Sequence, residues 1–289
     1  MSSAQQAEPR QPRQSGGRRK VPASLVIGLV LVGMVIVTAL VSFVWTPYDP
    51  LQIDAAERLL PPSPEHWLGT DRFGRDVFSQ LMVGARTTLF VGVIAVGIAA
   101  LAGIPLGVGA AVGRPWLSTF VMRGIDLTLA FPALLLAIMF GAVYGASTLT
   151  AMVAIGIATV PRFARLARSG TLQVMSTEYV LAARVAGRGV LPISVRHVLP
   201  NIASLLLVQA SVSFGIAVLA ESGLSYLGFG TAPPTPSWGR MLAEGRELIA
   251  VYPLLTLWPA LAIALAVLGF NLLGDGLRDR FDPRLEVSR

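Results

Sequence analysis

Five long stretches without a charged residue constrain this chain more than any other feature of its sequence. They cover residues 21–48, 87–113, 127–161, 198–220 and 248–274. A membrane-spanning helix needs about 20 consecutive apolar residues, so each stretch is long enough to cross a bilayer. Only 13% of all residues are charged, whereas soluble domains carry about 25%. The sequence therefore predicts an all-α, polytopic membrane protein.

The number of crossings follows from the third stretch and from the arginines. Residues 127–161 are too long for one helix, and the glycine-containing segment 141–147 lies in their middle, which predicts a hairpin of two helices and six crossings in all. With the N-terminus inside, 17 of the 23 Lys and Arg residues lie on the inner side and 6 on the outer side. This bias agrees with the positive-inside rule, whereas five crossings would place the arginines of residues 162–196 outside.

These crossings divide the chain into segments. Residues 1–20, rich in Gln, Pro, Ser and Arg, are expected to form a disordered cytoplasmic tail. A cleaved signal peptide is the rival interpretation, but the apolar segment is too long for a signal core and lacks a small-residue cleavage site. We expect a first transmembrane helix plus outer loop at 21–86. A core of five helices should follow at 87–280, with a cytoplasmic loop at 162–200, and a cytoplasmic tail at 281–289.

Composition and motifs argue against several classes of function. The chain has no cysteine, which excludes disulfides and thiolate chemistry. Its net charge of +7 comes from residues at the ends of apolar stretches, so topology explains it better than nucleic-acid binding. No Gly-x4-Gly-Lys-Ser/Thr phosphate loop is present, and His66 and His197 fall on opposite sides of the membrane. We therefore expect no nucleic acid, metal, cofactor or catalysis.

Within the crossings, small and polar residues stand out. Gly103 and Gly107, and likewise Gly109 and Gly113, have the spacing that lets helices pack closely. Polar residues inside the crossings are candidates for a translocation path, although they could equally bond neighbouring helices. Glu221, at the end of the fifth crossing, is either a functional acid or a carboxylate solvated at the membrane boundary. These candidates are Gln209, Ser211, Ser213, Glu221 and Asn271.

The cytoplasmic segment 176–201 breaks the apolar pattern with arginines, glycines and prolines. Residues 177–186 have helical spacing, Thr177 is a candidate N-cap, and Tyr179, Ala182 and Ala183 share one face with Ala186. Gly187 permits the backbone angles that end a helix. By pattern alone, an amphipathic helix lying at the membrane interface is the favoured explanation of this segment.

The spacing of Ala182, Ala183, Gly187 and Leu199-Pro200 resembles the "EAA" loop of ABC importer permeases, into which the ATP-hydrolysing subunit plugs. Leu181 stands where the general motif has Glu, and His197 where it often has Ile. Both suit the peptide-importer branch, which the segment from Tyr179 to Asn201 resembles. The resemblance implies a set of ATPase-coupling residues: Tyr179, Ala182, Ala183, Gly187, Arg196, His197 and Pro200.

The segment from His66 to Arg86 precedes the second crossing. Its alternating charges and glycines predict a structured outer loop. Its pattern His-x-Leu-Gly-Thr-Asp-x-x-Gly-Arg-Asp-x-x-Ser resembles the signature of the C-type permease subunit of dipeptide, oligopeptide and nickel importers, with Gln80 in place of the usual Arg. The signature residues are Gly69, Thr70, Asp71, Gly74, Arg75 and Asp76.

The family resemblance covers most of residues 45–283 and implies an ABC type I importer permease fold in the cytoplasmic membrane, with both termini in the cytoplasm. It implies that a homologous permease subunit, two ABC ATPase subunits and an extracytoplasmic substrate-binding protein assemble with the chain. The outer loops 49–86 and 222–248 are expected to meet the binding protein. The expected cargo is a short peptide, and nickel chelates or another small solute are the alternative. A stand-alone channel or an intramembrane enzyme is the alternative from a different class.

Overall fold

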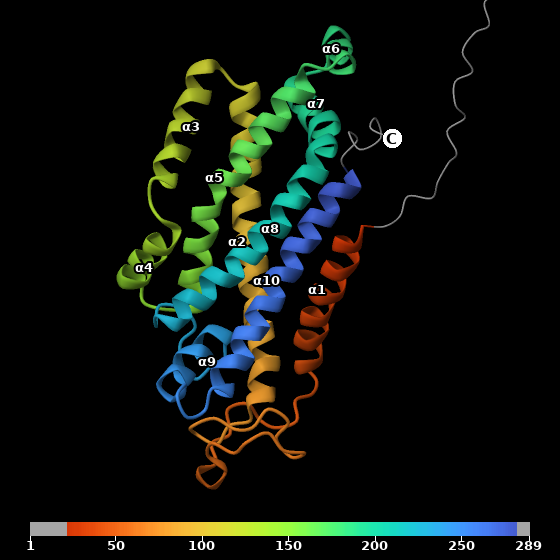
Figure 1. The fold of residues 1–289 in the computed structure, drawn as a ribbon. Coiled ribbons are helices and arrows are strands. Elements are labelled where there is room, and N and C mark those ends of the chain that lie inside the picture. The colour runs from red at the N-terminus through yellow and green to blue at the C-terminus, as the bar shows by residue number, and fades with distance from the viewer. Residues whose placement is uncertain (1–21, 282–289) are drawn as a thin grey trace, which may run out of the picture.

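The computed structural model describes residues 22–281, so the two predicted tails lie outside the described residues, apart from Phe281 at the end of the last helix. The described part is almost wholly helical (Figure 1). The α-helices are α1 (Ala23–Ser42), α2 (Val77–Val112), α3 (Pro115–Leu129), α4 (Ala133–Tyr144), α5 (Thr148–Met175), α6 (Glu178–Val185), α7 (Val190–Ile193), α8 (Leu199–Tyr226), α9 (Trp238–Gly245) and α10 (Leu254–Phe281). Short turns of other helix types lie at Ala55–Glu57, Ser194–Val198 and Arg246–Leu248.

Within residues 22–281, five helical segments are long and apolar enough to span a membrane: α1, α2, α5, α10, and α8 together with its lead-in from Val190. The pair α3 and α4 passes the same criteria only when taken together, and the two helices are bent by 83°. The bend falls before Pro132, whose ring disfavours a helical conformation in the preceding residue. Six crossings result when this bent pair counts as one span.

The predicted hairpin in the third stretch is present, but its first arm is the bent pair instead of one straight helix. Its turn lies at Gly145, which ends α4 with a φ of +90°. Ser147 then caps α5, because its side-chain oxygen accepts a hydrogen bond from the Thr150 amide. The turn therefore combines a left-handed glycine with an N-cap, two ordinary devices for ending one helix and starting the next.

Two helices are longer than the charge-free stretches indicated. Helix α2 begins at Val77 instead of residue 87, because Asp76 caps it by accepting a 2.7 Å hydrogen bond from the Ser79 amide. The helix α5 runs through Pro161 to Met175, so the cytoplasmic loop predicted from residue 162 begins only after Met175. Charged residues mark where a helix leaves the apolar interior of the membrane, whereas capping residues determine where the helix begins and ends.

Close packing at glycines holds the bundle together. A Cβ atom added to Gly103 in α2 would lie 2.7 Å from the Phe163 Cβ in α5, and one added to Gly276 in α10 would lie 2.6 Å from the Leu25 Cβ in α1. The predicted packing role is confirmed for Gly103 but not for Gly109, which has open space around it. In Figure 1, α6 lies at one end of the bundle, and α9 with the loop between α1 and α2 lies at the other.

Candidate functional site

The cytoplasmic helix expected at 177–186 forms as α6, Glu178–Val185. Its C-terminus is a Schellman motif: Gly187 has a φ of +79°, the Arg188 amide donates to the Ala183 carbonyl at 3.1 Å, and the Gly187 amide donates to Arg184 at 2.9 Å. Thr177 precedes the helix, but its side chain donates to the Val174 carbonyl at 2.6 Å instead of capping α6. The helix and its glycine stop are confirmed, and the predicted side-chain cap is wrong.

The face that α6 turns toward the bundle is narrower than expected. Val180 is fully buried in a cluster with Val198 and Ile202, and Ala183 is half-buried against the same cluster. Ala182 and Ala186 are exposed. The predicted small face is therefore divided, because Ala183 packs inward while the other two alanines remain open to a partner.

Large apolar side chains flank those alanines on the outside of the molecule. Val185 is 90% exposed, Leu191 74%, and Leu181 and Tyr179 47% each. We call the exposed residues Tyr179, Leu181, Ala182, Val185 and Leu191 the α6 surface. Such a patch at the tip of a bundle is typical of a protein interaction site. The sequence patterns did not predict Leu181, Val185 and Leu191 as members. Their signal is that they are apolar residues in a short polar segment but lie outside the face expected to be buried.

The other predicted coupling residues lie near α6, at the elbow that leads into α8. The rings of Tyr179 and His197 are 6.1 Å apart, and the Asn201 side chain donates to the His197 carbonyl at 2.6 Å. His197 is half-buried, whereas Arg196 and Pro200 are exposed. Segment 176–201 contains three exposed arginines and one acidic residue, Glu178, so the rim of the α6 surface is basic.

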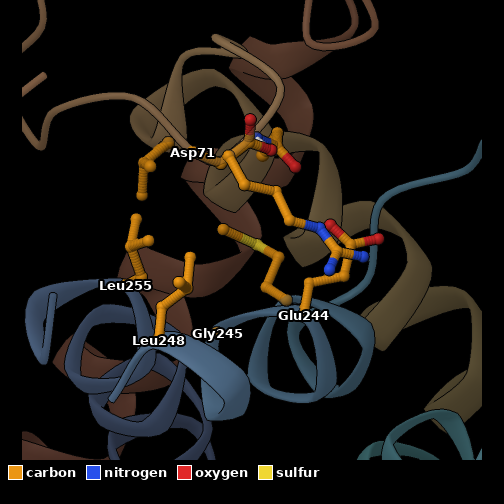
Figure 2. Close-up of a pocket in the computed structure, with 9 residues that line it drawn as sticks. Asp71, Glu244, Gly245, Leu248 and Leu255 are labelled. Atoms are coloured by element: carbon orange, nitrogen blue, oxygen red, sulfur yellow. Dashed lines mark hydrogen bonds between the residues drawn. The ribbon is translucent and has the colours of Figure 1, made fainter. Parts of the chain in front are cut away.

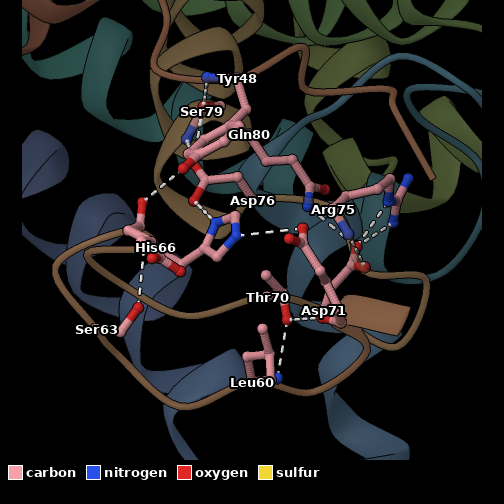
Figure 3. Close-up of polar contacts among 12 residues, drawn as sticks. Tyr48, Leu60, Ser63, His66, Thr70, Asp71, Arg75, Asp76, Ser79 and Gln80 are labelled. Carbon is pink, nitrogen blue, oxygen red and sulfur yellow. Dashed lines mark hydrogen bonds and ion pairs between the residues drawn. The ribbon is translucent and has the colours of Figure 1, made fainter. Parts of the chain in front are cut away.

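The outer-loop signature forms a buried polar network, drawn in Figure 3. Its residues Thr70, Asp71, Arg75 and Asp76 are each 9% exposed or less. Gly69 and Gly74 have φ values of +81° and +80°, and an added Cβ at either would collide with a backbone carbonyl of the same loop. The signature thus specifies how the loop folds on itself, and its residues are not open to a partner.

His66 and Asp76 join the loop to the start of α2. Asp76 caps the helix, accepts a 2.7 Å hydrogen bond from the Ser79 hydroxyl, and lies 3.0 Å from His66 Nδ1. The other ring nitrogen of His66 is 3.3 Å from Glu57, and its ring packs on Tyr48 with centroids 4.6 Å apart. One buried imidazole therefore connects two carboxylates from different parts of the loop.

Asp71 and Arg75 extend this network to α9. The carboxylate of Asp71 accepts hydrogen bonds from Arg75 Nε at 2.7 Å and from Gln80 at 3.0 Å. Arg75 Nη2 also lies 2.5 Å from Glu244, which in turn pairs with Arg240 at 2.8 Å. Gln80, which replaces the usual Arg of this outer-loop signature, serves here as a neutral donor.

Two polar residues of the crossings form hydrogen bonds, one within α8 and one between α8 and α10. Gln209 donates to Ser213 at 2.9 Å, and Ser211 donates to the Phe270 carbonyl in α10 at 2.6 Å. Asn271 instead lines a mostly apolar groove of about 560 Å³ between α8 and α10, and Tyr226 is another of its lining residues. Among the path candidates, Asn271 is the one that lines this groove.

Glu221 is not the solvated carboxylate that its place at a membrane boundary allowed. It is fully buried, and its Oε1 accepts hydrogen bonds from Ser225 at 2.6 Å and Thr231 at 3.1 Å. Glu221 therefore fastens the segment after α8 to the end of that helix. Across residues 22–281, no group of three His, Asp or Glu side chains is arranged to hold a metal ion.

Comparison with known proteins places this geometry in context. Residues 103–287 match the family model described as "Binding-protein-dependent transport system inner membrane component". The dipeptide transport system permease protein DppC of Alkalihalophilus pseudofirmus is 40% identical over 261 residues, which cover 90% of this chain and 86% of that protein. The glutathione transport system permease protein GsiD of Pectobacterium atrosepticum is 41% identical over 83% of this chain and 80% of its own length.

Among solved structures, a chain of the MetNI methionine ABC transporter in an inward-facing conformation matches with a TM-score of 0.59. Its sequence identity is 18%, and the match covers 70% of this chain and 97% of that one. The two chains therefore share the permease fold of an ABC importer.

Proposed function

Because this chain belongs to the family of binding-protein-dependent transport system inner membrane components, we propose that it forms half of the membrane path of an ABC importer for short peptides. A homologous permease supplies the other half, two ATPase subunits drive the cycle, and a binding protein delivers the cargo outside. The observation that carries the proposal is the α6 surface, an exposed apolar patch at one end of a bundle whose relatives are importer permeases.

Coupling to the ATPases follows from the construction of α6. Val180 packs the helix against the bundle and the Schellman turn at Gly187 ends it, while Val185 and Leu191 are free to enter an apolar groove on a partner. Exposed Arg184 and Arg188 rim the patch, which favours a groove with acidic edges. Movement of the ATPases would then reach α5 and α8 through the buried side of α6.

The orientation and segment boundaries are part of the same proposal. The arginine bias supports a cytoplasmic α6 and cytoplasmic termini, and α9 with the loop between α1 and α2 then faces the binding protein. The coupling loop shortens to residues 176–198, since α5 extends to Met175 and α8 begins at Leu199. Alternating access would consist of the two permeases rocking about a path between them.

Short peptides are the cargo that the relatives and the chain's own residues favour. One relative is named for dipeptides and another for glutathione, a small peptide. A bare nickel ion would favour imidazole or thiolate ligands, but the chain has no cysteine, and His66 and His197 lie at opposite ends of the bundle. The groove with Asn271 and Tyr226 offers hydrogen-bonding groups beside apolar surface, which suits peptide side chains and backbone.

Deleting the chain from its host tests the cargo. We expect loss of uptake of labelled di- and tripeptides, restored by the wild-type gene, and unchanged accumulation of nickel. Loss of nickel accumulation with intact peptide uptake would replace the cargo and leave the importer mechanism standing. Transport of either cargo by the purified chain alone in liposomes, without ATP, would instead indicate a stand-alone channel.

A further inference from the structure

The strongest feature that the proposed coupling does not use is the connection between the outer loop and α9. Arg75 lies between two carboxylates: its Nη2 is 2.6 Å from Asp71 in the outer loop and 2.5 Å from Glu244 in α9. The side chains of Arg75 and Glu244 are only 8% and 16% exposed. Partly buried ion pairs with this geometry are screened little by water, and removing one partner leaves an uncompensated charge.

Further contacts join the same two regions. The Trp238 indole donates to the Leu81 carbonyl at 2.9 Å, and Thr87 donates to the Pro236 carbonyl at 3.0 Å. Gly84 lies so close to Trp238 that an added Cβ would be 2.6 Å from the indole Cδ1. The first turns of α2 and the start of α9, about 150 residues apart in the chain, are therefore joined by two hydrogen bonds and one close contact.

A small cavity marks the centre of this contact. It has a volume of about 20 Å³ and lies among Asp71, Gln80, Met241 and Glu244 (Figure 2). This is room for about one water molecule. A cavity of this size in a contact lined by buried side chains is compatible with the close packing of a domain interior.

We infer that the outer loop and α9 form one rigid outer platform, residues 48–87 and 236–248, locked by Arg75 between Asp71 and Glu244. A binding protein that presses on either loop would then move the outer ends of α2 and α10 together. Arg75 is thus a positioning residue for the coupling between cargo delivery and helix movement. For its transport readout, this inference rests on the proposed function.

A reversible cross-link tests whether the platform moves as one body. Arg72 and Glu247 form an exposed ion pair across the same contact, 3.1 Å apart, and the chain has no other thiol. The variant Arg72→Cys/Glu247→Cys is joined outside the cell by a short, cleavable bis-maleimide, and each single variant receives the same treatment. Peptide uptake by the cross-linked protein should equal that of the same double variant without cross-linker. Loss of uptake that cleavage of the linker restores would show that the two loops separate during transport and would overturn the inference.

A second measurement needs no cargo, so it separates a wrong platform from a wrong function. Met241 in α9 lines the cavity and is 7% exposed. In a Met241→Cys variant, an impermeant maleimide should label slowly. Adding Glu244→Gln, which keeps the side-chain shape and removes the charge, should speed labelling by about tenfold, the factor that about 1.4 kcal/mol produces. Val251→Cys, at a position 70% exposed, should label equally in both backgrounds. An unchanged rate at Met241→Cys would contradict the lock, whatever the cargo is.

Discussion

Gly107 in α2 lies directly against Ala167 in α5: a Cβ atom added to Gly107 would be 2.8 Å from the Ala167 Cβ. Real Cβ atoms essentially never approach another atom within 3.0 Å, so even alanine requires the two helices to separate there. Gly109, two residues further along the same helix, has no neighbour within 4 Å.

This contrast gives a matched pair of variants. Gly107→Leu should destabilise the purified protein by about 1–3 kcal/mol, the cost of overpacking a filled interface, and lower its melting temperature in detergent. Gly109→Leu should leave the melting temperature near that of the wild type. Equal melting temperatures for the two variants would contradict the packing of α2 on α5.

Glu221 offers a test of the segment that follows α8. Glu221→Ala removes the acceptor for Ser225 and Thr231 and should cost about 1–3 kcal/mol, as expected when buried hydroxyls lose their partner. Limited proteolysis within residues 227–237 should become faster. Glu221→Gln keeps an oxygen acceptor and should behave closer to the wild type. If both variants resist proteolysis as well as the wild type does, Glu221 does not hold this segment.

The turn after α6 supplies a third pair. Gly187 has a φ of +79°, whereas Gly189 has a φ of −67°. Gly187→Ala should strain the backbone by about 1–2 kcal/mol and fray the C-terminal end of α6. In the assembled complex, stimulation of ATP hydrolysis by the loaded binding protein should fall. Gly189→Ala, whose added Cβ would meet only Pro192 at 3.7 Å, should keep normal stimulation. Weaker stimulation of ATP hydrolysis in Gly189→Ala than in Gly187→Ala would show that coupling does not depend on the Schellman turn.

Orientation is testable because the chain has no cysteine. Val251→Cys should react with an impermeant maleimide in intact cells, since the position is 70% exposed at the end of the molecule proposed to face outward. Ser176→Cys, also exposed, should react only after permeabilisation. Labelling of Ser176→Cys in intact cells would invert the orientation and place α6 out of reach of an ATPase.

Local signals in the sequence predict the positions of most of the long helices. The charge-free stretches located α1, α8 and α10, and Gly187 correctly predicted the end of α6. The start of α2 was placed too late because Arg86 interrupts the apolar stretch, although Asp76 and Ser79 provide a capping signal ten residues earlier. Charge alone therefore predicts a start that is too late, whereas the capping signal at Asp76 predicts the observed start.

Contacts between distant residues could not be predicted in the same way. Arg75 and Glu244 are 169 positions apart, and nothing near either residue indicates that they pair. Similarly, helical spacing groups Ala183 with Ala182, but which of the two turns inward depends on a cluster of Val180, Val198 and Ile202 from three elements. Local patterns specify helices and turns, whereas the identity of a buried partner depends on how the helices pack.

The most direct test of the account is ATP-driven peptide import by the reconstituted complex. Proteoliposomes carrying this chain, its partner permease and the two ATPases, with the binding protein added outside, should accumulate a labelled dipeptide only when ATP is inside. Val185→Asp, which puts a charge on the α6 surface, should abolish accumulation and prevent the ATPases from co-purifying. Ser176→Asp, next to α6 but outside that surface, should do neither. Dipeptide accumulation at the wild-type rate with Val185→Asp would contradict the claim that this chain is driven through α6.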